Sequence, residues 1–119
     1  MPATRTASRR LAPDGLNINE VRLGGIVIQV DAARRTPAGL AVLAFVMDHR
    51  SELREAGMNR RAVCRIRVVA IDLPQPEAAL IVSGAAVLVS GFIARDRNER
   101  DNRLILNARH VEAAASEIF

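Results

Sequence analysis

Arginine supplies all of the basic side chains in this sequence. Its 119 residues include 17 arginines and no lysine, against 13 aspartates and glutamates, so the formal net charge is +4. A guanidinium group is planar, always charged, and able to bind a phosphate through two hydrogen bonds or to stack on a base. A GC-rich genome also replaces lysine by arginine, so the choice of base has two explanations. Under either one, the positive charge favours an acidic partner such as nucleic acid.

Residue types that catalyse reactions or bind metals are present but not arranged for that chemistry. His49 and His110 have no second histidine or cysteine at the spacing of a metal site. The turn at residues 36–39, Thr-Pro-Ala-Gly, lacks the lysine and the following helix of a phosphate-binding loop. We therefore expect a binding module and not an enzyme, with no metal and no other cofactor.

Short β-branched segments separated by turn residues indicate an all-β domain. Five strands are expected, at residues 19–30, 40–49, 61–71, 85–95 and 103–112. Residues 50–60 are polar and charged, so we expect a long loop there, with room for one helical turn at residues 51–56. Pro74 and Pro76 predict a short helix or turn within residues 72–83.

The strand expected at residues 61–71 has the clearest alternation of side chains. Its core face is expected to carry Ala62, Cys64, Ile66 and Val68, with the cysteine as a small apolar filler. Its outer face carries Arg61, Val63, Arg65 and Arg67. This basic stripe either contacts nucleic acid or is the solvated face that a strand of a barrel needs.

Other apolar residues indicate where the core lies. On the first strand, Val21, Leu23 and Val27 share one face, and the pair Gly24-Gly25 indicates a bulge or a sharp coil. Gly91 is expected to allow a bend in the fourth strand. Phe45 and Phe92 are both surrounded by apolar residues, so we expect both rings in the core.

Five strands with a short helix between the third and fourth match the OB fold. The ligand face of that barrel involves strands two and three and the loops that join strands one to two and four to five. An SH3-like barrel also has five strands, and composition does not exclude it. In the OB arrangement those same places hold Arg34, Arg35, Arg61, Arg65, Arg67, Arg97, Arg100 and Arg103. The sequence therefore predicts an OB barrel whose basic face holds single-stranded nucleic acid.

The chain divides into three parts by composition. Residues 1–16 are expected to be a disordered basic extension, residues 17–112 the OB-fold domain, and residues 113–119 a short tail. A single cysteine and the lack of a secretory signal are typical of a reducing cytoplasm. No apolar stretch approaches the roughly 20 residues of a membrane span.

Five segments follow one another in a distinctive order and spacing. They are residues 19–25 (Asn-Glu-Val-Arg-Leu-Gly-Gly), 36–39 (Thr-Pro-Ala-Gly), 45–51 (Phe-Val-Met-Asp-His-Arg-Ser), 55–57 (Glu-Ala-Gly) and 89–94 (Val-Ser-Gly-Phe-Ile-Ala). Together they resemble the primosomal replication protein N family over about residues 19–112. The strongest match is residues 45–51 with the nearby residues 55–57.

The resemblance implies an OB-fold homodimer that binds single-stranded DNA and acts when a stalled replication fork is restarted. Its implied partners are a primosomal helicase and single-stranded-DNA-binding protein, and no catalytic residue or metal belongs to the role. Matching positions for DNA contact are Arg34, Arg50, Arg60 and the arginines of residues 96–103, where family members often have lysines. With the strand-three stripe and the two loops, the expected nucleic-acid-binding set is Arg34, Arg35, Arg50, Met58, Arg60, Arg61, Val63, Arg65, Arg67, Arg97, Arg100 and Arg103.

Two of these positions depart from the family. Family members often have aromatic side chains where this chain has Met58 and Val63, and such rings are stacking platforms for bases. Their replacement predicts weaker and more salt-sensitive DNA binding. Two alternatives therefore stay open: a protein-interaction OB module with weak DNA binding, and an RNA-binding OB protein.

Overall fold

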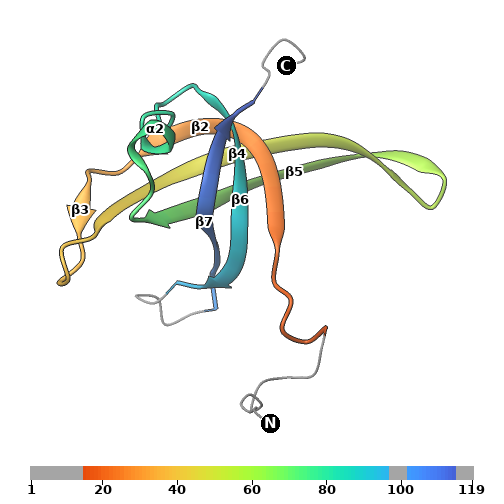
Figure 1. Cartoon of the computed structure of the whole chain (residues 1–119). Coiled ribbons are helices and arrows are strands. Elements are labelled where there is room, and N and C mark those ends of the chain that lie inside the picture. The colour runs from red at the N-terminus through yellow and green to blue at the C-terminus, as the bar shows by residue number, and fades with distance from the viewer. Residues whose placement is uncertain (1–14, 97–101, 115–119) are drawn as a thin grey trace, which may run out of the picture.

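Five long strands coil around one apolar core in the computed structural model, which describes residues 15–96 and 102–114. The strands are β2 (Val21–Val30), β4 (Ala41–Glu55), β5 (Met58–Ile71), β6 (Ala86–Arg95) and β7 (Leu104–Ala113). A two-residue strand, β3 (Arg34–Arg35), pairs with β4, and the short helix α2 (Gln75–Ala78) joins β5 to β6. Figure 1 shows β6 and β7 crossing the long β4–β5 hairpin. The expected strands and the expected helix are confirmed.

Strand β2 closes the sheet into a barrel because it pairs with two partners. Its residues from Val21 to Ile26 pair with β6, and those from Ile26 to Val30 pair with β4. Strand β7 is antiparallel to β6 and runs parallel to β5 over three residues. This five-stranded closed barrel, with its helix between the third and fourth long strands, is an OB fold.

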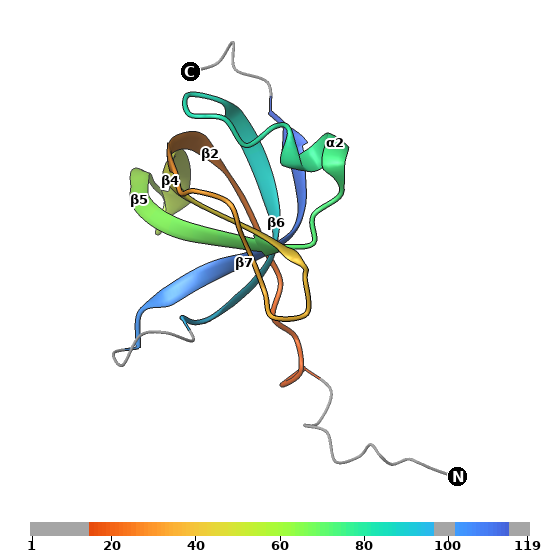
Figure 2. The same ribbon diagram turned by 90° about the vertical axis from the view of Figure 1, so that its left-hand side faces the viewer.

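Helix α2 lies at one end of the barrel, beside β7 (Figure 2). Pro76 occupies its first turn, where a missing backbone N–H has no cost. The Oε1 atom of Glu77 accepts a hydrogen bond of 2.7 Å from the backbone N–H of Val111. The helix therefore satisfies a donor at the end of β7.

The core contains the apolar side chains that alternation predicts. Phe45 is fully buried, as expected, and Val27 is buried with Val21 and Leu23 packed against the same cluster. The other side chains with almost no exposure are Met47, Val68, Val87, Val89, Leu106 and Val111. Together with Val27 and Phe45 they come from all five long strands, so each strand contributes to one core.

Two glycines allow strands to approach more closely than a side chain permits. Gly25 lies where β2 passes from β6 to β4, and a Cβ there would overlap the carbonyl oxygen of Asp48. Gly91 lies at a shift of register between β6 and β7, and a Cβ there would overlap the carbonyl oxygen of Asn107. Both were singled out from the sequence, and both serve close contact between backbones.

The expectation of a long loop at residues 50–60 is wrong. Strand β4 continues to Glu55 and β5 begins at Met58, in unbroken register. Ala56 and Gly57 both have positive φ, at 54° and 78°, which a two-residue type I′ hairpin turn requires. No helical turn forms at residues 51–56. The charges are compatible with a strand because this end of the hairpin extends beyond the barrel (Figure 1), where they stay in water.

The expected core position of Cys64 is also wrong. The alternation on β5 places Val68 and Ala70 in the core, with Ile66 packed against it. Cys64 is exposed, because it belongs to the part of the hairpin that has no core to face. Alternation identified the correct side of the strand, but nothing covers that side there.

Some expectations fall outside the described residues. Most of the expected extension at residues 1–16 and of the tail at 113–119 lies there, as do Arg97 and Arg100. Within residues 15–96 and 102–114, no helix is long and apolar enough to cross a membrane. The same residues contain no cluster of three or more His, Cys, Asp and Glu side chains suited to a metal ion.

Candidate nucleic-acid interface

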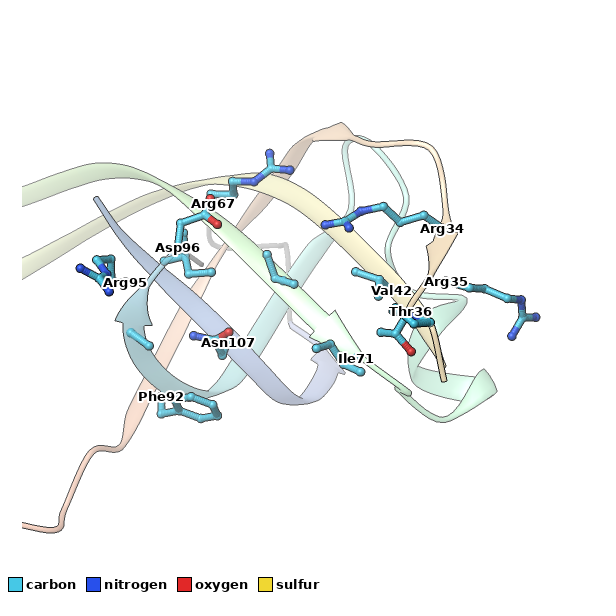
Figure 3. A pocket seen from close by; sticks show the side chains of 14 residues that line it. Arg34, Arg35, Thr36, Val42, Arg67, Ile71, Phe92, Arg95, Asp96 and Asn107 are labelled. Atoms are coloured by element: carbon cyan, nitrogen blue, oxygen red, sulfur yellow. The ribbon is translucent and has the colours of Figure 1, made fainter. Parts of the chain in front are cut away.

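A groove of about 430 Å³ crosses the outer face of the barrel (Figure 3). One wall is the loop between β2 and β4, with Arg34, Arg35 and Thr36. The floor is formed by outward side chains of β4, β5, β7 and β6, and includes Val42, Arg67, Val69, Phe92, Ile105 and Asn107. Arg95 and Asp96 lie where β6 ends. The groove therefore lies between the loop that joins β2 to β4, one of the two ligand loops of the OB pattern, and the end of β6.

The groove has free positive charge on two sides. Figure 3 shows Arg34 extending from β3 over the groove, while Arg35 points outward. The Nη1 atom of Arg35 donates to the carbonyl oxygen of Gly39 at 2.7 Å, which holds that side chain to its own loop. Within the described residues, neither Arg34 nor Arg95 has a carboxylate partner at ion-pairing distance. Two exposed guanidinium groups are therefore available to anions.

The arginines along β5 are each paired with a carboxylate. The pairs are Arg60–Glu55 at 2.7 Å, Arg61–Glu52 at 3.3 Å, Arg65–Asp48 at 2.8 Å, and Arg67–Asp31. The hydrogen bond that Arg65 donates to Asp48, together with the negative charge of Asp48, raises the pKa of Arg65, so this guanidinium stays charged. The outer face of β5 does carry the expected arginines, but the facing acidic side chains neutralise most of that stripe.

The remaining residues of the expected set fall into three groups. Arg50 pairs with Val63 in register, on the same outer face as Arg61 and Arg65. Met58 and Arg60 occupy the alternate positions and so face the other side of the hairpin. Arg103 is exposed immediately before β7. The structure thus brings Arg34, Arg35 and Arg67 together at the groove and distributes Arg50, Met58, Arg60, Arg61, Val63 and Arg65 along the hairpin.

Comparison with known proteins places this architecture in a family. Residues 19–110 match the family described as "Another single-strand binding protein family". Replication restart protein PriB of Photorhabdus laumondii is 36% identical over 99 residues, which cover 82% of this chain and 94% of that protein. The PriB of Nitrosomonas europaea is 35% identical over 94 residues, with 79% and 86% covered. The chain belongs to the PriB family.

Solved structures show that the PriB fold extends over most of the chain. PriB from Ralstonia solanacearum has a TM-score of 0.71 at 20% identity, covering 82% of this chain and 99% of that one. The single-stranded DNA binding protein from Thermus aquaticus has a TM-score of 0.62 at 23% identity, covering 84% and 52%. At these identities the likeness concerns the fold.

The groove of this PriB family member contains residues that the sequence analysis did not assign to the site, among them Phe92, Arg95 and Asn107. Phe92 was expected in the core, and this is wrong: the ring is half-buried and lines the groove. Val87 and Val89 point inward on β6, so strict alternation directs Phe92 outward. Arg95 and Asn107 were also missed. The signal for Asn107 was a polar residue directly after three apolar ones, at residues 104–106.

Proposed function

We propose that this protein binds single-stranded DNA in the groove and acts by binding, without catalysis, in the restart of replication. The observation that carries this proposal is the pair Arg34 and Arg95, whose guanidinium groups have no carboxylate partner among the described residues and lie on two sides of a groove on the OB ligand face. The names of its relatives, replication restart proteins and single-stranded DNA binding proteins, support the same role.

The composition of the groove favours a single strand over a duplex. Its edges offer guanidinium groups to phosphates, while Val69, Phe92 and Ile105 give the floor an apolar surface. In a single strand the bases are free to lie against such a floor, whereas in a duplex they are stacked and paired. The expected contacts at Arg50, Arg61, Val63 and Arg65 would extend the path of DNA along the hairpin only weakly, because Glu52 and Asp48 already neutralise Arg61 and Arg65.

The protein's partners follow from the same assignment. We propose a cytoplasmic homodimer that cooperates with the primosomal helicase and with single-stranded-DNA-binding protein. A dimeric structure of the N-terminal domain of PriB from Thermoanaerobacter tencongensis supports the dimer. The hairpin supports a protein contact because Leu53 is 55% exposed and Met58 is 70% exposed.

The experiment that tests the function is the fluorescence anisotropy of a labelled oligothymidine of roughly 25 nucleotides, titrated at several salt concentrations. Matched duplex DNA and RNA are the competitors. We expect tighter binding to the single-stranded DNA, with a logarithmic salt slope of about −0.7 for each phosphate contact. No binding at low salt would overturn the proposal and favour an interaction barrel. A preference for RNA would indicate an RNA-binding protein.

Releasing the paired arginines should tighten binding. Asp48→Asn and Glu52→Gln remove the partners of Arg65 and Arg61, so each variant frees one guanidinium on the outer face of the hairpin. We expect affinity for oligothymidine to rise about fivefold for each, at about 0.1 M salt. The free energy of unfolding should change by less than about 1 kcal/mol, because exposed ion pairs contribute little.

Glu112→Gln is the matched control for these two variants. It makes the same change in charge at an exposed site near the end of β7, without releasing an arginine that faces the groove or hairpin. Equal affinities for the three variants would exclude the outer face of the hairpin from the path of DNA.

A further inference from the structure

Three outward side chains lie next to one another at the centre of the groove floor. Asn107 on β7 is opposite Phe92 on β6, and on its other side it is opposite Val69 on β5. All three line the groove, and Figure 3 shows Asn107 and Phe92 on neighbouring strands of its floor. An aromatic ring and an amide are therefore adjacent where a ligand would rest.

The amide of Asn107 is not satisfied by the protein. Its Nδ2 atom is buried and has no hydrogen-bond partner among the described residues. A buried amide donor without a partner is destabilising, and native proteins contain few of them. Valine and isoleucine around it, at Val69 and Ile105, offer no acceptor. The donor is thus without a partner, and it can bond to an acceptor that a ligand brings once the amide rotates and turns Nδ2 into the groove.

Another residue of β7, Arg109, holds Phe92 in position. The guanidinium carbon of Arg109 lies 5.0 Å from the centroid of the Phe92 ring, a cation–π contact. The register makes this contact: Ser90 pairs with His110 and Gly91 with Ala108, so Arg109 is the extra residue of a β-bulge. A ring fixed in this way loses little freedom when a base stacks on it.

We propose that Phe92 and Asn107 form a subsite for one nucleobase of single-stranded DNA. The base stacks on the Phe92 ring, and an acceptor atom on its edge takes the hydrogen bond from Asn107 Nδ2. This inference rests on the proposed function and names the part of DNA that the floor recognises. Phosphates stay at the rim with Arg34 and Arg95, because a phosphate among Val69 and Ile105 would lose its hydration without a counter-charge.

The subsite detects the presence of a base and not its identity. Each of the four bases carries a carbonyl oxygen or ring nitrogen that accepts a hydrogen bond. Every base also has a flat face for stacking. Discrimination is therefore expected between a strand with bases and the same backbone without them.

The test compares oligothymidine with an abasic strand of equal length, which has the same phosphates. We expect the wild-type protein to bind the abasic strand more weakly. Asn107→Leu keeps the approximate shape but removes the donor, so its affinity for oligothymidine should fall about fivefold. Phe92→Leu should lower it about tenfold. Binding of the abasic strand and the salt slope should stay at wild-type values for both variants.

A second measurement separates loss of the subsite from misfolding. Because Asn107→Leu removes an unsatisfied buried donor, its Tm should rise by roughly 5 °C while its affinity falls. Asn17→Leu makes the same substitution at an exposed site and should alter neither quantity.

The outcomes distinguish the subsite from the function on which it rests. A wild-type protein that does not bind oligothymidine overturns both. Wild-type protein that binds oligothymidine and the abasic strand equally overturns the subsite alone. The same holds if both leucine variants at the floor bind oligothymidine as tightly as the wild type.

Discussion

Replacing Arg34 and Arg95 together by glutamine is expected to weaken binding of single-stranded DNA about 25-fold at about 0.1 M salt. Each guanidinium lies at the groove and lacks a carboxylate partner within the described residues, so each is available to a phosphate. Loss of two phosphate contacts should also make the logarithmic salt slope less steep by about 1.4. Anisotropy titrations across a salt series measure both quantities.

The matched control is the double variant Arg61→Gln with Arg65→Gln. It removes the same amount of charge, but from arginines that already pair with Glu52 and Asp48. We expect a much smaller loss of affinity and little change in slope. If the control loses as much affinity as the groove variant, the DNA follows the hairpin and the groove is not its principal site.

Gly91→Ala is expected to lower the free energy of unfolding by about 3 kcal/mol, the upper part of the range for overpacking. The added Cβ would overlap the carbonyl oxygen of Asn107 and lie 3.0 Å from the Cα of Ala108. Both obstacles are backbone atoms, so no side chain can rotate to relieve the contact. Strands β6 and β7 must separate at the bulge that positions Phe92 and Asn107.

Urea denaturation followed by circular dichroism measures this change, and Gly24→Ala is its control. A Cβ at Gly24 would have its nearest neighbour, the carbonyl oxygen of Val87, at 3.8 Å, which is an ordinary contact. We expect that variant to change stability by less than about 1 kcal/mol. Equal midpoints for the two variants would contradict the close approach of β6 and β7.

The strands and the core were predictable because both depend on local patterns. Alternation placed Val27 and Val68 correctly in the interior, and apolar neighbours in sequence placed Phe45 there. Turn residues also marked the loop between the first two long strands, so the positions of Arg34 and Arg35 followed from the order of elements. A period of two identifies the face of a strand on which a side chain lies, and five such strands leave few ways to bury their apolar faces.

Other expectations failed where the surroundings, and not the strand, decide the outcome. Alternation along β5 assigned Cys64 to the correct face of the strand, but no other element covers that face at this end of the hairpin. Phe92 was judged by its apolar neighbours in sequence, although alternation on β6 directs it outward. The charged segment at residues 50–60 was read as a loop because charged side chains disfavour burial. An exposed hairpin does not require its side chains to be buried, so the segment forms strands.

The sequence by itself determined the OB barrel, the positive charge that favours an acidic partner and the elements that carry its arginines. Only the tertiary structure decided which of those arginines are free. Arg67 pairs with Asp31, 36 positions away, and Arg65 with Asp48, 17 positions away. The tertiary structure also placed Asn107 of β7 between Phe92 of β6 and Val69 of β5. Ion pairs and ligand subsites depend on distances between strands, and those distances exist only once the barrel has closed.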